Sequence, residues 1–418
     1  MDGNQVTKAA SSAEPVPLRR NRDFTLLWTG QAASLLGNQI SFLAYPLLIL
    51  AATGSAAQAG LMASVTLAST LTLLLPAGVI ADRHPRKRIM VTASLIQMVA
   101  GATVVPAVLS HHVYLIQLAV VGCVQGAAAA FYQGASRGAT RRIVPLEQLP
   151  EAMAATQARD RVTTLAGGPI GGALFGFARF LPFAVDAASF GVIGLAAALI
   201  RKSLDPISRP APEPLRRSVT AGIRFVVQQP FVRMFAIWTT FLNGIVFGLR
   251  LTIIVLARNR GATPFEIGLM FAITAALGLP GALVAVRLTK WVGARPLILI
   301  TSWLFPVCTL GMFFAPSVWV IAALAGVTGF AIMPINVILI ARSTLVTPDH
   351  LQAQVGNALQ LCYQGLASLT PLIFGALTDK IGPYTMIAIA AAMFGMLALW
   401  LQLNRQLYQL DDKQAGTG

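Results

Sequence analysis

Two carboxylates interrupt long apolar stretches of this sequence, and their placement suggests chemistry most directly. Asp160 and Asp186 lie inside apolar segments, whereas most of the 15 acidic residues lie in loops or terminal regions. A charged side chain is costly to place within a membrane, so an intramembrane acid usually binds ions or substrate or is paired structurally. We therefore take Asp160 and Asp186 as candidate proton-coupling residues.

Asp160 is the first choice of the two, although its neighbours Arg159 and Arg161 favour a charged carboxylate. Adjacent helix positions point about 100° apart, so these arginines need not contact it. The competing interpretation pairs Asp160 with Arg137 or with loop arginines in a structural cluster. Asp186 lies about one turn into its expected helix, where the helix dipole stabilises a carboxylate. That position favours a structural role, and Asp186 is the second choice.

A compact charge cluster occupies the sequence GVIADRHPRKR at residues 78–88, between two apolar stretches. A carboxylate among arginines forms charge-assisted hydrogen bonds, and a glycine at a helix end lets two helices approach closely. We expect this segment to close one side of the molecule by pairing and by meeting a helix terminus of the other half. The competing interpretation is an ordinary basic loop at a membrane surface. The residues of this gate motif are Gly78, Asp82, Arg83, Arg86 and Lys87.

Polar and aromatic side chains recur inside the apolar stretches, where they are candidates to line a cavity. These candidates are Asn38, Gln133, Trp238, Asn243, Arg250, Asn336 and Gln360. For each one alone, helix packing or lipid contact is the competing interpretation. Arg250 either holds an anionic part of a substrate or extends its long side chain to the nearby surface. As a group they favour an amphipathic organic substrate, because a sugar site would contain more charged and amide groups.

The composition identifies the environment in which these residues act. The chain has 418 residues, of which 56% are hydrophobic and 11% charged, so it lacks the charge that a soluble domain needs on its surface. Its net charge of +16 does not indicate nucleic-acid binding, because the basic residues lie between apolar spans. No nucleotide-binding loop, metal-ligand cluster or nucleophile–base pair is present in the sequence, so we expect neither an enzyme nor a cofactor or metal site.

The hydropathy pattern predicts an all-α membrane protein with twelve transmembrane helices in two pseudo-symmetric six-helix bundles. The predicted spans are 24–50, 59–81, 89–109, 113–136, 151–178, 182–200, 231–256, 265–287, 296–314, 317–341, 350–377 and 383–403. These give an N-terminal arm (1–23), a first bundle (24–200), a linker with a surface helix (201–230), a second bundle (231–403) and a tail (404–418).

The distribution of basic residues predicts the orientation in the membrane. When loops are assigned alternately to the two sides, one side holds 23 lysines and arginines and the other holds four. Basic loops remain in the cytoplasm. We therefore expect both termini in the cytoplasm and a multi-pass protein of the bacterial cytoplasmic membrane.

Landmarks in the two halves of the chain repeat at matching spacing. Pro169 follows Gly78 by 91 positions, and Pro371 follows Gly281 by 90 positions. Parallel repeats of this kind are typical of transporters that bind substrate between two halves.

A glycine-rich stretch, TTLAGGPIGGAL, lies in the fifth span. It contains Gly167, Gly168, Pro169, Gly171 and Gly172. Small residues let transmembrane helices pack closely, and proline adds a bend, so a tight helix crossing is the structural interpretation.

Together these motifs resemble the major facilitator superfamily. Residues 78–88 resemble its loop pattern G-x-x-x-D-R-x-G-R-K, with Pro85 in place of the second glycine. The stretch around Pro169 resembles the G-P-x-x-G-G signature of superfamily exporters that exchange substrate for protons. The resemblance is closest to the twelve-helix branch that contains the enterobactin exporter and macrolide efflux proteins.

This resemblance implies a secondary active efflux transporter that exports drug-like or secondary-metabolite molecules in exchange for protons, by alternating access. We expect it to act as a monomer in the lipid bilayer, on a small-molecule substrate and without nucleic acid. Two alternatives are a siderophore exporter of the same fold and a membrane scaffold or sensor without transport.

Overall fold

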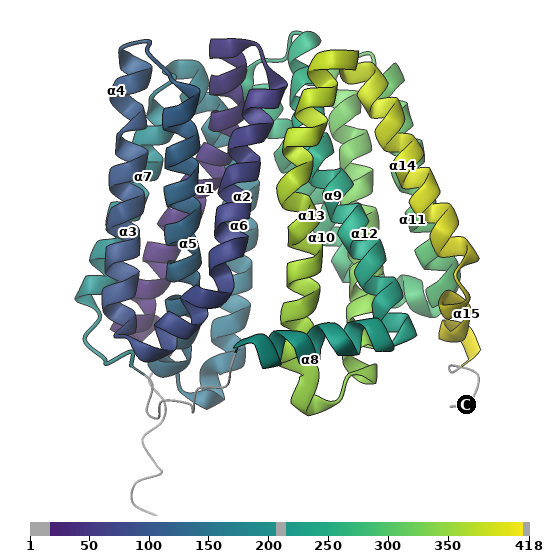
Figure 1. Ribbon diagram of the computed structural model, residues 1–418, viewed down its shortest axis with the longest axis horizontal. Coiled ribbons are helices and arrows are strands. Elements are labelled where there is room, and N and C mark those ends of the chain that lie inside the picture. The colour runs from purple at the N-terminus through teal and green to yellow at the C-terminus, as the bar shows by residue number, and fades with distance from the viewer. Residues whose placement is uncertain (1–16, 206–214, 413–418) are drawn as a thin grey trace, which may run out of the picture.

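The computed structural model describes residues 17–205 and 215–412, which are almost entirely helical (Figure 1). The predicted N-terminal arm therefore lies mostly outside the described residues, as do parts of the linker and of the tail. The first group of helices comprises α1 (Arg22–Thr53), α2 (Ala56–Arg83), α3 (Arg86–Ala102), α4 (Val104–Leu109), α5 (Leu115–Ile143), α6 (Leu149–Phe177) and α7 (Leu181–Leu199). The second comprises α8 (Leu215–Gln228), α9 (Pro230–Asn259), α10 (Pro264–Val292), α11 (Ala294–Phe314), α12 (Val318–Val346), α13 (Gln352–Ile381), α14 (Pro383–Leu403) and α15 (Arg405–Asp412).

Among the described residues, eleven helical segments are long and apolar enough to cross a membrane, with α3 and α4 forming one of them. The remaining long helix, α6, is less apolar because it contains Arg159, Asp160, Arg161 and the glycine-rich stretch. It packs against α1 and α10, which cover it on two sides. Arg159 is buried in this packing, whereas Asp160 is half-buried and Arg161 is exposed.

The long helices form two groups that stand side by side (Figure 1). Helices α1–α7 contact one another in the first bundle, and α9–α14 do so in the second. The main contacts between the bundles are α2 with α13 and α6 with α10. The structure thus has the all-α, two-bundle membrane fold that the hydropathy pattern predicts.

The helix ends lie at two faces of the molecule, which we call the terminal face and the opposite face. The terminal face holds the start of α1 and the end of α14, together with the turn between α2 and α3 (Figure 1). The opposite face holds the turns at Gly54, Gly261 and Gly382, where each glycine has the positive φ that ends a helix tightly. Helix α8 lies along the terminal face, where Gly222 contacts the Gln354 backbone of α13.

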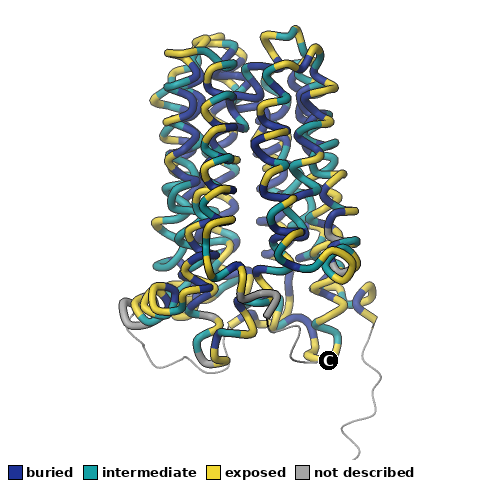
Figure 2. Tube along the Cα trace, turned by 90° about the vertical axis from the view of Figure 1, so that its right-hand side faces the viewer, coloured by how far each residue is buried: buried dark blue, intermediate teal, exposed yellow. Residues whose placement is uncertain are grey.

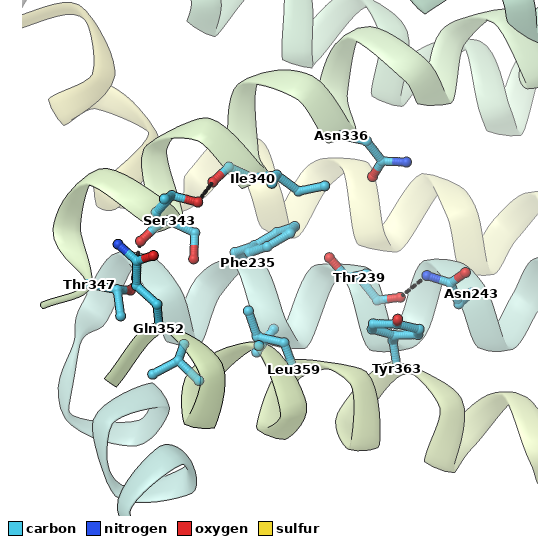
Figure 3. A pocket seen from close by; sticks show the side chains of 14 residues that line it. Phe235, Thr239, Asn243, Asn336, Ile340, Ser343, Thr347, Gln352, Leu359 and Tyr363 are labelled. Atoms are coloured by element: carbon cyan, nitrogen blue, oxygen red, sulfur yellow. Dashed lines mark hydrogen bonds between the residues drawn. The ribbon is translucent and has the colours of Figure 1, made fainter. Parts of the chain in front are cut away.

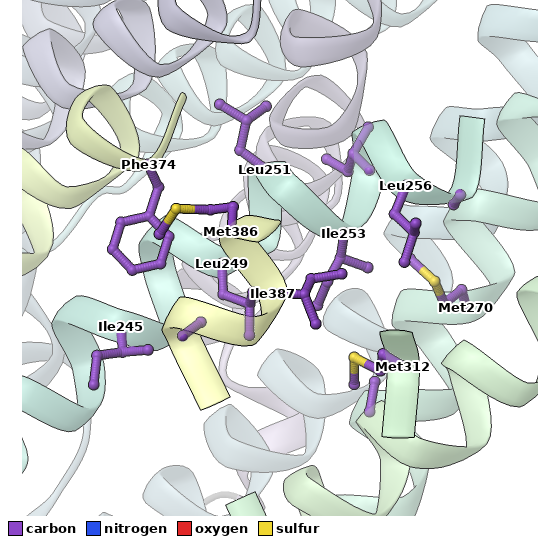
Figure 4. Packing of buried hydrophobic residues seen from close by; sticks show 14 of the residues in the cluster. Ile245, Leu249, Leu251, Ile253, Leu256, Met270, Met312, Phe374, Met386 and Ile387 are labelled. Atoms are coloured by element: carbon purple, nitrogen blue, oxygen red, sulfur yellow. The ribbon is translucent and has the colours of Figure 1, made fainter. Parts of the chain in front are cut away.

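Buried residues lie between the helices, and exposed ones lie on the outside of the bundles (Figure 2). Figure 4 shows part of the largest apolar cluster, in which Leu249 of α9 packs near Phe374, Met386 and Ile387. Large apolar side chains are also exposed, among them Phe177 at 87% of its surface. Such exposure suits helices surrounded by lipid.

Candidate functional site

The glycine-rich stretch of α6 makes two different helix contacts on adjacent faces. A Cβ on Gly171 would lie 2.8 Å from the Ile40 carbonyl oxygen, and Gly167 similarly faces Gln39, so this pair packs on α1. A Cβ on Gly168 would lie 2.7 Å from the Gly268 carbonyl oxygen of α10. The stretch therefore binds α6 to its own bundle and to the other bundle at once.

Gly172 extends the second contact, because a Cβ there would collide with the Pro264 carbonyl oxygen of α10. In return, a Cβ on Gly268 would collide with the backbone of Gly168. Each helix thus supplies a glycine to the other, near the opposite face.

The α2–α13 contact is built in the same way. A Cβ on Gly60 of α2 would collide with the Pro371 carbonyl group, and one on Gly375 of α13 would collide with that of Ala56. Leu372 donates a backbone hydrogen bond to Ser64 Oγ at 3.1 Å. We call the α2–α13 and α6–α10 contacts together the outer junction.

Asp379, near the end of α13, caps the start of α2 across the outer junction. Its carboxylate accepts hydrogen bonds from the backbone N–H groups of Ala56 (2.8 Å) and Ala57 (2.9 Å) and from the Ser55 hydroxyl (2.7 Å). A carboxylate at a helix N-terminus satisfies free N–H groups and interacts favourably with the helix dipole. This cap belongs to the second bundle, while the capped helix belongs to the first.

A cavity lies between the bundles, next to the outer junction. We call it the central cavity; it is lined from the first bundle by α1, α2, α5 and α7 and from the second by α9 and α13. Its residues include Asn38, Phe42, Tyr45, Met62, Gln125, Asp186, Phe247, Arg250, Ile254 and Pro371. Most of this surface is apolar, and two ionisable side chains of opposite charge, Asp186 and Arg250, share it.

Asp186 is enclosed in the wall contributed by the first bundle, with 2% of its surface exposed. Its Oδ1 atom has no hydrogen-bond partner, and the same is true of the buried Gln125 Nε2 atom. The Tyr45 hydroxyl donates to Gln125 Oε1 at 3.4 Å, and the Tyr45 ring packs on Phe183 at 4.9 Å between centroids. Buried polar atoms without partners are uncommon in proteins, and a functional role is one explanation for them.

Arg250 lies between two aromatic rings. Its Cζ atom is 4.1 Å from the centroid of Phe42 in α1 and 4.4 Å from that of Phe271 in α10. The rings hold the guanidinium from both bundles by cation–π attraction, worth about 1 kcal/mol each. Within the described part of the chain no hydrogen bond or ion pair joins Arg250 to an acceptor. The side chain lines the central cavity, which favours the first interpretation of Arg250.

A second cavity, of about 470 Å³, lies within the second bundle towards the terminal face. Figure 3 shows Thr239 and Asn243 of α9, Asn336 of α12 and Tyr363 of α13 around it. Asn243 Nδ2 donates to the Thr239 carbonyl at 2.9 Å, while Thr239 Oγ1 has no partner. Asn243 and Asn336, both predicted to line a cavity, therefore lie together in this polar but uncharged region.

Three other predicted cavity residues lie elsewhere. Trp238 is 1% exposed and belongs to the apolar core, so its assignment to the cavity was wrong; the aromatic ring fills space between helices. Gln133 is exposed on α5 and Gln360 is half-buried on α13. Neither lines the two cavities described above.

Asp160 differs from Asp186 in both exposure and pairing. Its side chain is 43% exposed and its Oδ1 atom accepts bonds from Arg159 Nε (3.0 Å) and Nη2 (2.9 Å). Arg159 also donates to Gln31 Oε1 at 2.6 Å. Arg159 thus contacts Asp160 although adjacent helix positions need not meet, because its flexible side chain curls back along α6. The competing interpretation placed Arg137 or loop arginines in this position, and the partner among the described residues is Arg159.

The gate motif lies on the terminal face, at the α2–α3 turn. Arg86 Nη2 binds Asp82 Oδ1 at 3.0 Å, with the Asp82 side chain 52% exposed. Arg86 Nη1 donates to the Leu204 carbonyl at 3.3 Å, and Lys87 donates to that of Ile200 at 2.8 Å. All these partners belong to the first bundle or to the segment that follows it. Arg83 is exposed, and a Cβ on Gly78 would meet nothing within 4 Å.

Two features of the site could not be read from the sequence. Phe42 and Phe271 resemble other apolar residues until the fold brings them to Arg250. In the sequence Asp379 resembles a loop acid. Ser55 is a common N-cap residue and so indicates the start of α2, but it does not indicate that Asp379 binds there.

The fold and central cavity define a class of protein, namely a multi-pass membrane protein with a ligand-sized space between two helical bundles. Comparison with known families identifies it: the family description "Major Facilitator Superfamily" matches residues 27–371, and the chain belongs to this superfamily. The resemblance inferred from the motifs is therefore confirmed. The superfamily consists of transporters, so the chain is not expected to be an enzyme.

Curated relatives match over nearly the whole chain. The multidrug efflux pump Tap of Mycolicibacterium fortuitum is 25% identical over 385 residues, covering 89% of this chain and 93% of that pump. The enterobactin exporter EntS of Shigella boydii is 26% identical over 400 residues, covering 94% of each chain.

Solved structures share the fold. A nucleoside transporter, NupG, aligns with a TM-score of 0.72 and 12% identity, covering 93% of this chain and 98% of that one. A bacterial homologue of the human lysosomal transporter Spinster, inward-facing and occupied, aligns with a TM-score of 0.73 and 15% identity, covering 96% and 99%.

Proposed function

We propose that this chain is a secondary active exporter of drug-like or secondary-metabolite molecules in the bacterial cytoplasmic membrane, with both termini in the cytoplasm. The similarity to a multidrug efflux pump and to an enterobactin exporter supports export, as does the glycine-rich stretch of α6. The excess of basic residues at the terminal face supports the orientation. With that orientation, the structure is closed to the outside by the outer junction.

The observation that carries the proposal is the position of Asp186. This acid lies in the wall of the cavity between the bundles, enclosed and with one oxygen unpaired. A charged carboxylate in such surroundings is costly, whereas a protonated one is not. Asp186 can therefore exist in two protonation states, depending on which side the cavity opens to.

We assign proton coupling to Asp186 in preference to Asp160. Asp160 Oδ1 already accepts two bonds from Arg159, and its side chain is 43% exposed, whereas Asp186 Oδ1 is enclosed beside the central cavity without a partner. Asp160 is better suited to a structural role beside Gln31 and Arg159 in the first bundle.

The gate motif completes an alternating-access cycle. When the outer junction opens, Asp82 and its arginines would turn from their present partners to a helix terminus of the second bundle. A helix N-terminus attracts a carboxylate, which would hold the cytoplasmic side closed.

Accumulation assays test this function. Expression in an efflux-deficient bacterium should lower the accumulation of at least one compound in a panel of amphipathic drugs, and collapsing the proton gradient should abolish the effect. Asp186→Asn should lose gradient-driven export but keep downhill exchange, while Asp160→Asn should keep both. Gradient-driven uptake would reverse the direction, and an unchanged accumulation of every compound would favour the scaffold or sensor alternative.

A siderophore exporter is a second candidate, favoured by the 26% identity to EntS over 400 residues. Secretion of siderophore into the medium by cells with and without the gene tests it. Reduced secretion in the deletion strain, with no change in drug accumulation, would favour this function over drug export.

A further inference from the structure

The central cavity contains a positive and a negative side chain, and neither has a partner of opposite charge within the described residues. The described residues form the ion pairs Arg86–Asp82 and Arg159–Asp160, and both pairs lie outside the central cavity. Arg250 is held between Phe42 and Phe271, with its N–H groups unbonded. Asp186 Oδ1 likewise has no donor. Both side chains line the central cavity, which makes them the candidate contacts for the charged groups of a ligand bound there.

The guanidinium geometry indicates what binds to Arg250. A planar guanidinium donates two parallel hydrogen bonds to a carboxylate. Phe42 and Phe271 contact the Arg250 guanidinium, and no acceptor among the described residues binds its N–H groups, so these donors remain available to a ligand in the cavity. The remaining wall, which includes Met62, Phe247 and Ile254, suits an apolar or aromatic body.

The charges also exclude simpler ligands. An anion alone would leave the Asp186 carboxylate unpaired and would be repelled by it, and a cation alone would be repelled by Arg250. A neutral ligand would leave Arg250 unpaired in a mostly apolar cavity, and Asp186 as well whenever its carboxylate is ionised. A ligand with an acidic and a basic group satisfies both.

We propose that the central cavity binds zwitterionic amphipathic molecules, with the acidic group on Arg250 and the ammonium group on Asp186. This inference rests on the proposed function, because it takes the central cavity as the substrate site. It names a class of substrate that neither the family nor the relatives specify.

This arrangement makes proton and substrate move in opposite directions across the membrane. A proton on Asp186 removes the attraction for an ammonium group, so proton and zwitterion compete for one site, as exchange requires. A purely anionic substrate would instead bind better after protonation, which would move both in the same direction. The other titratable side chains that line the central cavity are Tyr45 and Arg250. Gln125 of α5 also lines it, and Gly101 of α3 lies beside Gln125 and Ala187.

A matched series of tritiated probes tests the proposal by direct binding to the purified full-length protein in nanodiscs. Tryptophan is zwitterionic, its methyl ester cationic, N-acetyltryptophan anionic and N-acetyltryptophan methyl ester neutral. Each charge-assisted contact should contribute about tenfold in affinity, so tryptophan should bind at least about tenfold more tightly than the other three. Lowering the pH should weaken tryptophan binding and leave the neutral probe unchanged.

Variants assign each charge to its residue. Arg250→Gln should abolish the preference for tryptophan over its methyl ester, and Arg250→Lys should retain part of it. Asp186→Asn should abolish the preference over N-acetyltryptophan. Unchanged binding of the neutral probe shows that each variant is folded. Arg258→Gln, on the exposed end of α9, and Glu147→Gln, on the terminal face, are controls that should leave all four affinities unchanged.

Equal affinities for the four probes, or a uniform loss in Arg250→Gln, would overturn the zwitterion site. If drug efflux persists despite that result, the proposed function stands and only the substrate class fails. Full gradient-driven efflux in Asp186→Asn would instead overturn the assignment of proton coupling to Asp186. The binding series measures the preference for zwitterionic probes independently of that result.

Discussion

The outer junction and the gate motif lie at the two ends of the same pair of bundles, but they are formed by different kinds of interaction. At the outer junction, glycines on both partners bring helix backbones into contact, as Gly172 does with Pro264. At the terminal face, the hydrogen bonds of Arg86 and Lys87 stay within the first bundle and the segment that follows it. Close backbone packing thus joins the bundles at the outer junction, whereas charged side chains occupy the terminal face.

This difference has a consequence for how each end responds to change. Backbone contact depends on the absence of a side chain, so one added methyl group is enough to disturb it. Charge pairs at a water-exposed surface are weak and easily exchanged, which suits a gate that must change partners in each cycle. Three substitutions test the contrast.

Gly172→Ala should have the largest effect. The added methyl group must displace the Pro264 carbonyl, and overpacking of this kind costs about 1–3 kcal/mol, enough to shift the balance towards an open outer junction by about fivefold or more. Export should fall accordingly. The measurement is labelling of Ala63→Cys in the central cavity by a membrane-impermeant thiol reagent from outside, with Cys123, Cys308 and Cys362 replaced by serine.

Gly176→Ala is the matched control, because it adds the same methyl group one turn later on α6, where nothing lies within 4 Å. Its labelling and export should equal those of the parent protein. If Gly172→Ala is also silent, the outer junction does not depend on backbone contact.

Asp82→Asn should have a smaller effect, of the opposite kind. Loss of one carboxylate–dipole contact costs about 1 kcal/mol, which corresponds to about fivefold less outward-facing protein and slower export. The unfolding temperature should not change, because the Asp82–Arg86 pair is half-exposed and contributes little. Transport in proteoliposomes and calorimetry measure the two quantities. Normal transport would refute the gate hypothesis.

Asp379→Asn should have the smallest effect. The amide keeps one acceptor oxygen at the start of α2 but loses the second acceptor and the charge, so outside labelling of Ala63→Cys should rise by about threefold. Glu266→Gln is the control, because Glu266 caps α10 within its own bundle. An equal change in both variants would indicate general destabilisation rather than an opened junction.

The sequence predicted the spans because hydropathy and helix breakers act locally. The surface helix expected within the linker at 201–230 begins at Leu215, and the span predicted at 383–403 corresponds to α14. Where ends differ, the helix usually continues beyond its apolar part: α5 extends to Ile143 because Arg141 and Arg142 remain helical in the surface layer.

The site was less predictable because it depends on which helices meet. Trp238 and Arg250 are both on α9, yet one packs in the core and the other lines the central cavity. Asp160 looked intramembrane by position, but its exposure and its bond to Arg159 depend on side-chain placement. Asp186, which was ranked second, became the stronger candidate only when its enclosure was visible.

The composition of α6 has a consequence for the biosynthesis of the protein. During synthesis α6 leaves the ribosome well before α10, which begins at Pro264, so the face with Gly168 and Gly172 has no partner when α6 enters the membrane. The other face, with Gly167 and Gly171, can already pack on α1. Early insertion of this weakly apolar helix therefore depends on its contact with α1. Helix α10 can pack on the face with Gly168 and Gly172 only after translation has continued through α10.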